Sequence, residues 1–193
     1  MMPRIDITKL FLQVYEAYPA RIVNRNDIEL SNNIILPPSA LDFLTKNNII
    51  EESKNPILFR VLNYEINIST YAGVIDFTAE EGKCYLPTNM FDRLCLLEGQ
   101  NVNIRKSSLE RGIYVRLRPY DIEFMEKINQ KDIIEYNLKN YFCLTPYDII
   151  SFKFGEKIYK LDVIECKPNK AIRIINSNIE VDFCPPKDNE KSP

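Results

Sequence analysis

Apolar and polar positions alternate through the last third of the chain. The period of two runs through residues 150–154, 159–163, 172–174 and 179–183. It places successive side chains on opposite faces of a strand. Before these strands, apolar residues recur at the helical positions 134, 138, 141 and 142. The pattern predicts a small antiparallel sheet with one apolar face, backed by one helix.

The first half contains one nine-residue stretch twice, as residues 36–44 and again fifty positions later as residues 86–94. Both copies open with Leu-Pro, carry aspartate at the seventh position and end in leucine. Proline ends a strand and presets the start of a helix, because its ring fixes φ and it has no N–H to donate. Each copy therefore predicts a strand, a proline corner and a short helix, flanked by further strands.

Side chains near each corner predict how the helix is capped and buried. Ser39 in the first copy, and Thr88 or Asn89 in the second, are expected to accept hydrogen bonds from the first amides of their own helix. Apolar residues three apart share one helix face. In the two copies these pairs are Leu41 with Leu44 and Phe91 with Leu94.

Strands are also predicted at residues 57–62 and 69–77, around a polar turn. Residues 101–106 and 113–118 are predicted to form the last hairpin of this half. Asn47-Asn48 is expected to end the first short helix in the left-handed conformation, and Glu98-Gly99 to close the second with a glycine cap. Because the pattern changes at Pro119, we divide the chain into residues 11–119, residues 120–186 and a disordered tail, 187–193. Residues 1–10 are expected to be a loosely held terminus.

Composition excludes several classes of chemistry. With 25 basic and 27 acidic residues, the chain has no nucleic-acid footprint and no polybasic membrane patch. Histidine is absent, and the five cysteines never form a CxxC pair, which argues against zinc, histidine-based catalysis and a disulfide framework. Phosphate-loop, dinucleotide and nucleophile-elbow motifs are also absent. We therefore expect no cofactor, no metal and no membrane insertion, in a soluble protein of a reducing compartment.

Several collinear motifs resemble one known family. They are Ile35-Leu-Pro-Pro-Ser-Ala-Leu-Asp42, Gly73-Val-Ile-Asp-Phe77, Glu81-Gly-Lys-Cys-Tyr-Leu-Pro87, Cys143-Leu-Thr145 with Asp148, Glu156-Lys-Ile-Tyr159, Lys167-Pro168 and Val181-Asp-Phe183. From about Phe11 to Pro186, the chain resembles the N-terminal domain of the ubiquitin fusion degradation protein 1 family. The resemblance implies a mixed β/α+β fold, in which a double-psi β-barrel is followed by a small α/β subdomain.

The resemblance also implies a function. Members of this family are non-catalytic adaptors that bind ubiquitin and polyubiquitin chains and present ubiquitylated proteins to a valosin-containing-type AAA ATPase. The segments that hold this ATPase and nuclear protein localisation protein 4 lie C-terminal to the N domain in the family, so the chain is expected to be an isolated N domain or a short member. The implied route is proteasomal and ER-associated degradation. The implied location is the cytoplasm and nucleus, including the cytosolic face of the ER.

Two positions depart from the family pattern. The family usually has a glycine pair where this chain has Asn32-Asn33, and a glycine where it has Tyr147. Asparagine tolerates a left-handed φ and would preserve a turn, whereas tyrosine would be strained there.

Candidate ubiquitin contacts follow from complementarity with an apolar patch rimmed by basic residues, the surface that the family's ligand offers. Such a surface needs exposed apolar side chains next to carboxylates. Two stretches have this composition. The first contains Ile122, Glu123, Phe124 and Met125, and the second contains Glu80 and Glu81 beside Phe77. Packing of Phe124 and Met125 onto the barrel, and a solvated turn at Glu80-Glu81, are the alternatives.

Two other functions remain to be weighed. Double-psi barrels also include aspartic proteases, for which Asp42 and Asp92 would be the carboxylate pair. Both aspartates lie within predicted helices, near positions that favour the positive helix N-terminus, and no Asp-Thr/Ser-Gly motif surrounds them. We therefore expect no catalysis. The last alternative is an adaptor that binds peptides in a cleft between the two subdomains without engaging ubiquitin directly.

Overall fold

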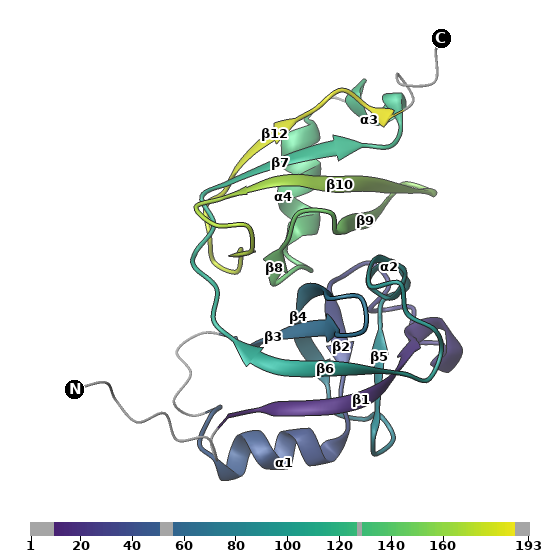
Figure 1. Cartoon of the computed structure of the whole chain (residues 1–193). Helices are drawn as coiled ribbons and strands as arrows, with labels where there is room; N and C mark the ends of the chain where they lie inside the picture. The colour runs from purple at the N-terminus through teal and green to yellow at the C-terminus, as the bar shows by residue number, and fades with distance from the viewer. Residues whose placement is uncertain (1–9, 51–55, 127–128, 188–193) are drawn as a thin grey trace, which may run out of the picture.

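Six strands close into a barrel in the first half of the chain (Figure 1). The computed structural model describes residues 10–50, 56–126 and 129–187. Around the ring the strands are β1 (Leu12–Pro19), β5 (Lys83–Leu86), β2 (Asn33–Ile35), β4 (Ile68–Asp76), β3 (Leu58–Asn63) and β6 (Gln100–Ser107). Two short helices, α1 (Pro38–Lys46) and α2 (Thr88–Arg93), connect strands of the ring.

The twofold repeat predicted from the sequence is confirmed. The pairing of the strands is unchanged when β1 is exchanged with β4, β2 with β5, and β3 with β6. Thus β1 lies parallel to β5 as β4 lies parallel to β2, while β1–β6 and β4–β3 are both antiparallel. Each helix starts directly after the proline of its copy.

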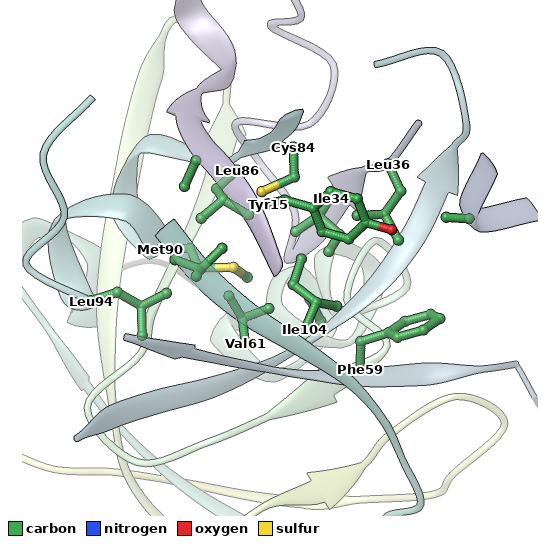
Figure 2. Close-up of a cluster of buried hydrophobic side chains, with 14 of the residues drawn as sticks. Tyr15, Ile34, Leu36, Phe59, Val61, Cys84, Leu86, Met90, Leu94 and Ile104 are labelled. Carbon is green, nitrogen blue, oxygen red and sulfur yellow. The ribbon is translucent and has the colours of Figure 1, made fainter. Parts of the chain in front are cut away.

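The apolar residues of both copies meet inside the barrel (Figure 2). Leu36 and Leu86 are fully buried there, and so is Leu94, while Leu44 is almost fully buried. Leu41 is 38% exposed, so its predicted burial is wrong. The residues labelled in Figure 2 come from both halves: Tyr15, Ile34, Leu36, Phe59, Val61, Cys84, Leu86, Met90, Leu94 and Ile104.

The two copies of the repeat divide the barrel into two halves, and a carboxylate from one half caps the helix of the other. Both N-cap residues are prolines without a side-chain bond, so the predicted self-capping is wrong. The Ser39 amide and hydroxyl donate to the two carboxylate oxygens of Glu81, at 3.1 and 2.5 Å. The Thr88 amide and hydroxyl donate to Glu29, at 2.9 and 3.0 Å. The two halves are thus joined reciprocally at their helix ends.

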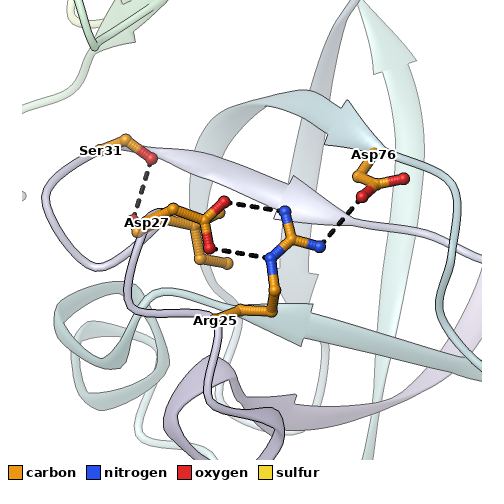
Figure 3. Close-up of polar contacts among 5 residues, drawn as sticks. Arg25, Asp27, Ser31 and Asp76 are labelled. Carbon is orange, nitrogen blue, oxygen red and sulfur yellow. Dashed lines mark hydrogen bonds and ion pairs between the residues drawn. The ribbon is translucent and has the colours of Figure 1, made fainter.

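The loop that carries Glu29 is fixed by an arginine (Figure 3). Arg25 donates to both oxygens of Asp27 at 2.8 Å and to Asp76, at the end of β4, at 2.9 Å. The guanidinium lowers the pKa of Asp27. Ser31 closes the same loop with a hydrogen bond from its hydroxyl to the Ile28 carbonyl at 2.9 Å. These contacts place Glu29 at the start of α2.

The second half forms a four-stranded sheet with a helix against it (Figure 1). Its strands, in order, are β12 (Glu180–Phe183), β7 (Tyr114–Pro119), β10 (Lys157–Lys167) and β9 (Ile149–Phe154). The backing helix α4 (Gln130–Leu138) buries Ile134 and Leu138 in this core. Because β12 is parallel to β7, the all-antiparallel prediction is wrong at this edge. A separate two-stranded sheet pairs β8 (Cys143–Leu144) with β11 (Ile172–Arg173).

The predicted hairpin of residues 101–106 and 113–118 is wrong. β6 belongs to the barrel, whereas β7 pairs with β10 and β12. The change of sheet therefore lies between Ser107 and Tyr114, ahead of the predicted boundary at Pro119. At the other end, Lys187 bonds to Asp162 at 2.7 Å, although the sequence assigned it to the disordered tail. The rest of that tail, 188–193, and residues 1–9 lie outside the described residues.

A close contact joins the two subdomains at Gly73 of β4. A Cβ atom built there would lie 2.1 Å from a ring carbon of Phe142 and 2.6 Å from the Asn33 side-chain oxygen. Beside it, the Asn32 side chain donates to the Cys143 carbonyl at 2.6 Å and accepts from the Phe142 amide at 3.0 Å. Neither asparagine has a positive φ, so the turn predicted for this pair is wrong, and Asn32 joins the subdomains instead.

We expect Gly73→Ala to lower the free energy of unfolding by roughly 1–3 kcal/mol, because the added methyl group displaces the Phe142 ring. Urea denaturation would measure the loss. Phe142→Leu in the same chain makes room for the methyl group, so the double variant should lose less than the sum of the single variants. Strict additivity would contradict the assigned contact.

Candidate functional site

The first predicted site lies on α3 (Ile122–Met125), between β7 and α4. Phe124 is only 1% exposed and packs against the rings of Phe152, Tyr159 and Phe183. Met125 is partly buried against the same core. The sequence-based alternative of packing therefore holds for Phe124, but it packs within the second subdomain rather than on the barrel. Ile122 and Glu123 are exposed.

Salt bridges and a hydrogen bond connect α3 to the β9–β10 hairpin. The Glu123 carboxylate accepts from Lys157 at 2.8 Å and from the Tyr159 hydroxyl at 3.1 Å. Lys157 also bonds to Asp121 at 3.3 Å. Exposed apolar groups lie at both elements, with Ile122 40% and Phe154 44% exposed.

We call this region the α3–hairpin surface and define it as Ile122, Glu123, Phe154, Glu156 and Lys157. A shallow depression covers its hairpin side, lined by Glu123, Phe154, Gly155, Glu156, Lys157, Ile158 and Tyr159. The surface combines half-exposed apolar side chains with two carboxylates. Sequence reasoning missed Phe154, which alternation placed among the buried residues. The Gly155-Glu156 turn beside it was the available signal, since a side chain at the end of a sheet has fewer neighbours.

The second predicted site is the turn before β5. Glu81 is engaged by Ser39 at the start of α1, as described above. Glu80 is exposed and forms an ion pair with Lys83. The structure does not bring this turn to α3, because the two lie in different subdomains. Glu81 thus caps α1, and Glu80 is the carboxylate of this turn that is more accessible to a ligand.

Asp42 and Asp92 do not form a carboxylate pair. They lie on α1 and α2, which occupy opposite ends of the barrel (Figure 1). Both residues are exposed. A shared-proton dyad needs two carboxyl groups in contact, so this geometry does not support aspartic-protease chemistry.

Polar contacts close the junction between the subdomains. Asn89 of α2 donates to the Ser151 hydroxyl at 2.7 Å, and the Thr70 hydroxyl donates to Asp148 at 2.6 Å. The remaining cavity is about 20 Å³ and is lined by Ser31, Asn32, Asn89, Met90, Asp148 and Ile149. That volume suits about one water molecule. This part of the junction therefore has no room for a peptide.

Asp148 is the titratable group of the junction. Burial raises its pKa from 3.8 to about 7, although the Thr70 hydroxyl and the Arg93 guanidinium oppose the shift. Its other oxygen, Oδ1, lies 3.9 Å from Arg93 Nε and has no hydrogen-bond partner among the described residues. Tyr147, directly before it, has φ 75° and places its ring 5.5 Å from the Arg93 guanidinium. Tyr147 stands where the family usually has glycine, and it adopts the left-handed conformation that is strained for a tyrosine, as expected.

A larger hollow of about 500 Å³ opens between the second subdomain and the segment just before β3 of the barrel. Pro56, just before β3, contributes one wall, and α4 and the segment 174–179 form the others. Leu138, Tyr141 and Ile174 provide apolar lining, while Glu135 and Lys139 lie on α4. This hollow could accept an apolar side chain from an extended segment.

Comparison with known proteins matches both halves of the structure. Residues 11–110 match the family described as "Ubiquitin fusion degradation protein UFD1, N-terminal subdomain 1", and residues 111–186 match its N-terminal subdomain 2. The chain belongs to the ubiquitin fusion degradation protein 1 family. The division of this family at residues 110 and 111 falls between β6 and β7, where the sheet changes.

Family members from distant organisms are similar over most of the chain. "Ubiquitin recognition factor in ER-associated degradation protein 1" of Homo sapiens is 40% identical over 163 residues, 84% of this chain and 52% of that protein. The Dictyostelium discoideum homolog of ubiquitin fusion degradation protein 1 is 35% identical over 93% of this chain and 54% of its own length. The Saccharomyces cerevisiae protein is 31% identical over 94% and 51%. The chain spans about half the length of these relatives.

The described residues, 10–50, 56–126 and 129–187, also bear on metal and membrane sites. Among them, no group of three or more cysteine, aspartate or glutamate side chains is placed to hold a metal ion. None of the described helices has the length and apolar character needed to span a membrane.

We expect Glu81→Gln to destabilise the fold by about 1 kcal/mol, because the carboxylate is lost from the N-terminus of α1. Glu80→Gln is the matched control, since it removes a carboxylate from the same turn and leaves this cap intact. Urea denaturation of both variants would measure the difference. Equal stability of the two variants would contradict the capping role of Glu81.

Asp148 predicts a pH-dependent stability. Its raised pKa means that the folded protein retains a proton that the unfolded chain releases above pH 3.8. The free energy of unfolding should therefore fall as the pH rises from about 4 to about 7, by roughly 2–4 kcal/mol from this group. Asp148→Asn should remove this slope while other carboxylates titrate as before. Parallel pH profiles of the two proteins would contradict the prediction.

Proposed function

We propose that the chain is a non-catalytic adaptor domain that binds ubiquitin through the α3–hairpin surface. The observation that carries the proposal is the coexistence there of exposed Ile122 and Phe154 with the carboxylates of Glu123 and Glu156. An apolar patch rimmed by basic residues, as ubiquitin offers, is complementary to such a surface because apolar side chains meet apolar side chains and basic groups meet carboxylates.

The family supports this choice of ligand. One relative is named as a ubiquitin recognition factor in ER-associated degradation, and others are named for the degradation of ubiquitin fusions. The first of these names describes recognition rather than a reaction. The separate positions of Asp42 and Asp92 likewise support a non-catalytic role.

The fuller role extends this binding to a pathway. In it, the domain helps to present ubiquitylated substrates to a valosin-containing-type AAA ATPase, together with nuclear protein localisation protein 4, for extraction and proteasomal degradation. It would act in the cytoplasm and nucleus, including the cytosolic face of the ER. The family resemblance supports these partners. A double-psi arrangement of the barrel belongs to the same proposal, supported by the twofold symmetry of its strand pairing.

A peptide-binding module is the second candidate. The hollow between Pro56, α4 and the segment 174–179 favours it, because its volume of about 500 Å³ and apolar lining suit a side chain of a linear segment. The two ligands would contact different residues, those of the α3–hairpin surface and those of the hollow, so a titration that maps the shifted residues separates them.

The test is an NMR titration of the isotopically labelled protein with monoubiquitin and then with polyubiquitin chains. Saturable shifts should appear at α3 and at the β9–β10 turn. The double variant Ile122→Ser/Phe154→Ser should weaken binding at least about tenfold, the loss expected when roughly 1.4 kcal/mol of contact is removed. Unchanged NMR signals from the barrel residues would show that the double variant is still folded.

Ile75→Ser is the matched control, because Ile75 is an exposed apolar residue on β4, away from the proposed surface. It should bind as the parent protein does. Shifts confined to the hollow at α4 would favour the peptide-binding module. No shifts at millimolar ubiquitin would refute the proposed function.

A further inference from the structure

The outer face of the barrel carries a regular array of side chains on four neighbouring strands. Residues directly opposite each other in the strand register share a face. One row contains Leu12, Arg105, Arg60 and Tyr71, and the next contains Val14, Asn103, Leu62 and Ser69, on β1, β6, β3 and β4 respectively. We call these eight residues the barrel face. Figure 1 shows β1 and β6 side by side at the front of the barrel.

Alternation along the strands directs the barrel face outward. The intervening residues Val61, Thr70 and Ile104 are fully buried. By contrast, Leu12 is 52% and Val14 is 55% exposed. Two aliphatic side chains thus project next to each other from β1 toward solvent and do not contribute to the barrel core.

Two arginines lie directly opposite each other in the middle of this array. Arg60 and Arg105 are register partners on β3 and β6, and like charges in such a position destabilise a sheet. Neither arginine forms an ion pair with a described carboxylate, and the barrel face itself contains no acidic residue. Arg60 Nε donates to the Ser69 hydroxyl at 3.0 Å, which uses one of its five N–H donors.

This positive charge is local rather than general. The whole chain has a formal net charge of −2. The α3–hairpin surface in the other subdomain combines apolar groups with two carboxylates and one ammonium group, Lys157, which is bonded to Glu123. The barrel face combines apolar groups with guanidinium groups and has no carboxylate. A partner with a basic rim would be repelled by Arg60 and Arg105, so the barrel face fits a different partner from the one proposed above.

We propose that the barrel face binds an extended segment of another protein in which carboxylates alternate with aliphatic side chains. The two guanidinium forks suit carboxylate oxygens, which would also relieve the repulsion between Arg60 and Arg105. Leu12, Val14 and Leu62 flank the arginines and provide contact for the aliphatic groups. The proposal does not depend on ubiquitin binding.

The probe is a fluorescent ten-residue peptide with glutamate at every second position and leucine or serine between, measured by anisotropy at low ionic strength. We expect saturable binding that weakens as salt is added. A peptide with glutamine in place of glutamate should bind at least about tenfold more weakly, because charge-assisted hydrogen bonds are lost. Leu12→Ser should also weaken binding without changing its salt dependence.

Arg105→Glu distinguishes binding from folding. It should abolish binding of the acidic peptide and raise the thermal unfolding midpoint, because the repulsive pair with Arg60 becomes an attractive one. A damaged fold would lower that midpoint. Lys160→Glu is the matched control, since it reverses an exposed cation on β10, and it should bind the peptide as the parent protein does.

Three outcomes with the peptides and variants would overturn the proposal, and a fourth comes from a competitor. The first three are equal binding of the glutamate and glutamine peptides, unchanged binding by Arg105→Glu, and equal weakening by Lys160→Glu. A single-stranded oligonucleotide of the same net charge should compete poorly, since it lacks the aliphatic groups. Competition as strong as that of the peptide itself would identify a general anion site instead, and would also refute the proposal.

Discussion

The barrel depends on a reciprocal exchange of carboxylates between its two halves. Each helix begins at a proline corner that supplies no cap of its own, and the first amides of a helix have no partner within it. Glu81 binds the start of α1 and Glu29 binds the start of α2. Helices of nine and six residues are marginal alone, so each needs the other half for its stability. The two copies of the repeat therefore form one cooperative unit rather than two small domains.

The sequence predicted what short-range chemistry determines. Proline placed both corners, and alternation placed most strands, because φ and side-chain direction are local properties. The residues that these groups contact could not be predicted in this way, because they lie far away in the chain. Glu81 is 42 positions from Ser39 and Glu29 is 59 from Thr88, so no nearby residue revealed the caps. The prediction of a hairpin between β6 and β7 was wrong for the same reason. Alternation identifies both segments as strands, but it does not reveal that they join different sheets.

Surface sites were harder to predict for a related reason. Composition identified α3 as apolar and acidic, but it could not decide which aromatic ring points inward. Phe124 packs into a cluster of rings, whereas Phe154 ends a strand beside a turn and stays half exposed. Arg60 and Arg105 gave no local signal either, since only the register of β3 and β6 brings them together. Such sites exist only after the sheets have formed.

The junction determines how the two surfaces can be used. Phe142 packs closely over Gly73. The Asn32 side chain bonds to two backbone groups of the second subdomain, the Phe142 amide and the Cys143 carbonyl. Such contacts fix a relative position, because moving one subdomain would break several bonds at once. The barrel face and the α3–hairpin surface, the two binding surfaces proposed above, are then held in a fixed relative position. Under the two proposals made above, the surfaces take ligands of different charge, so the domain would hold two different partners at the same time.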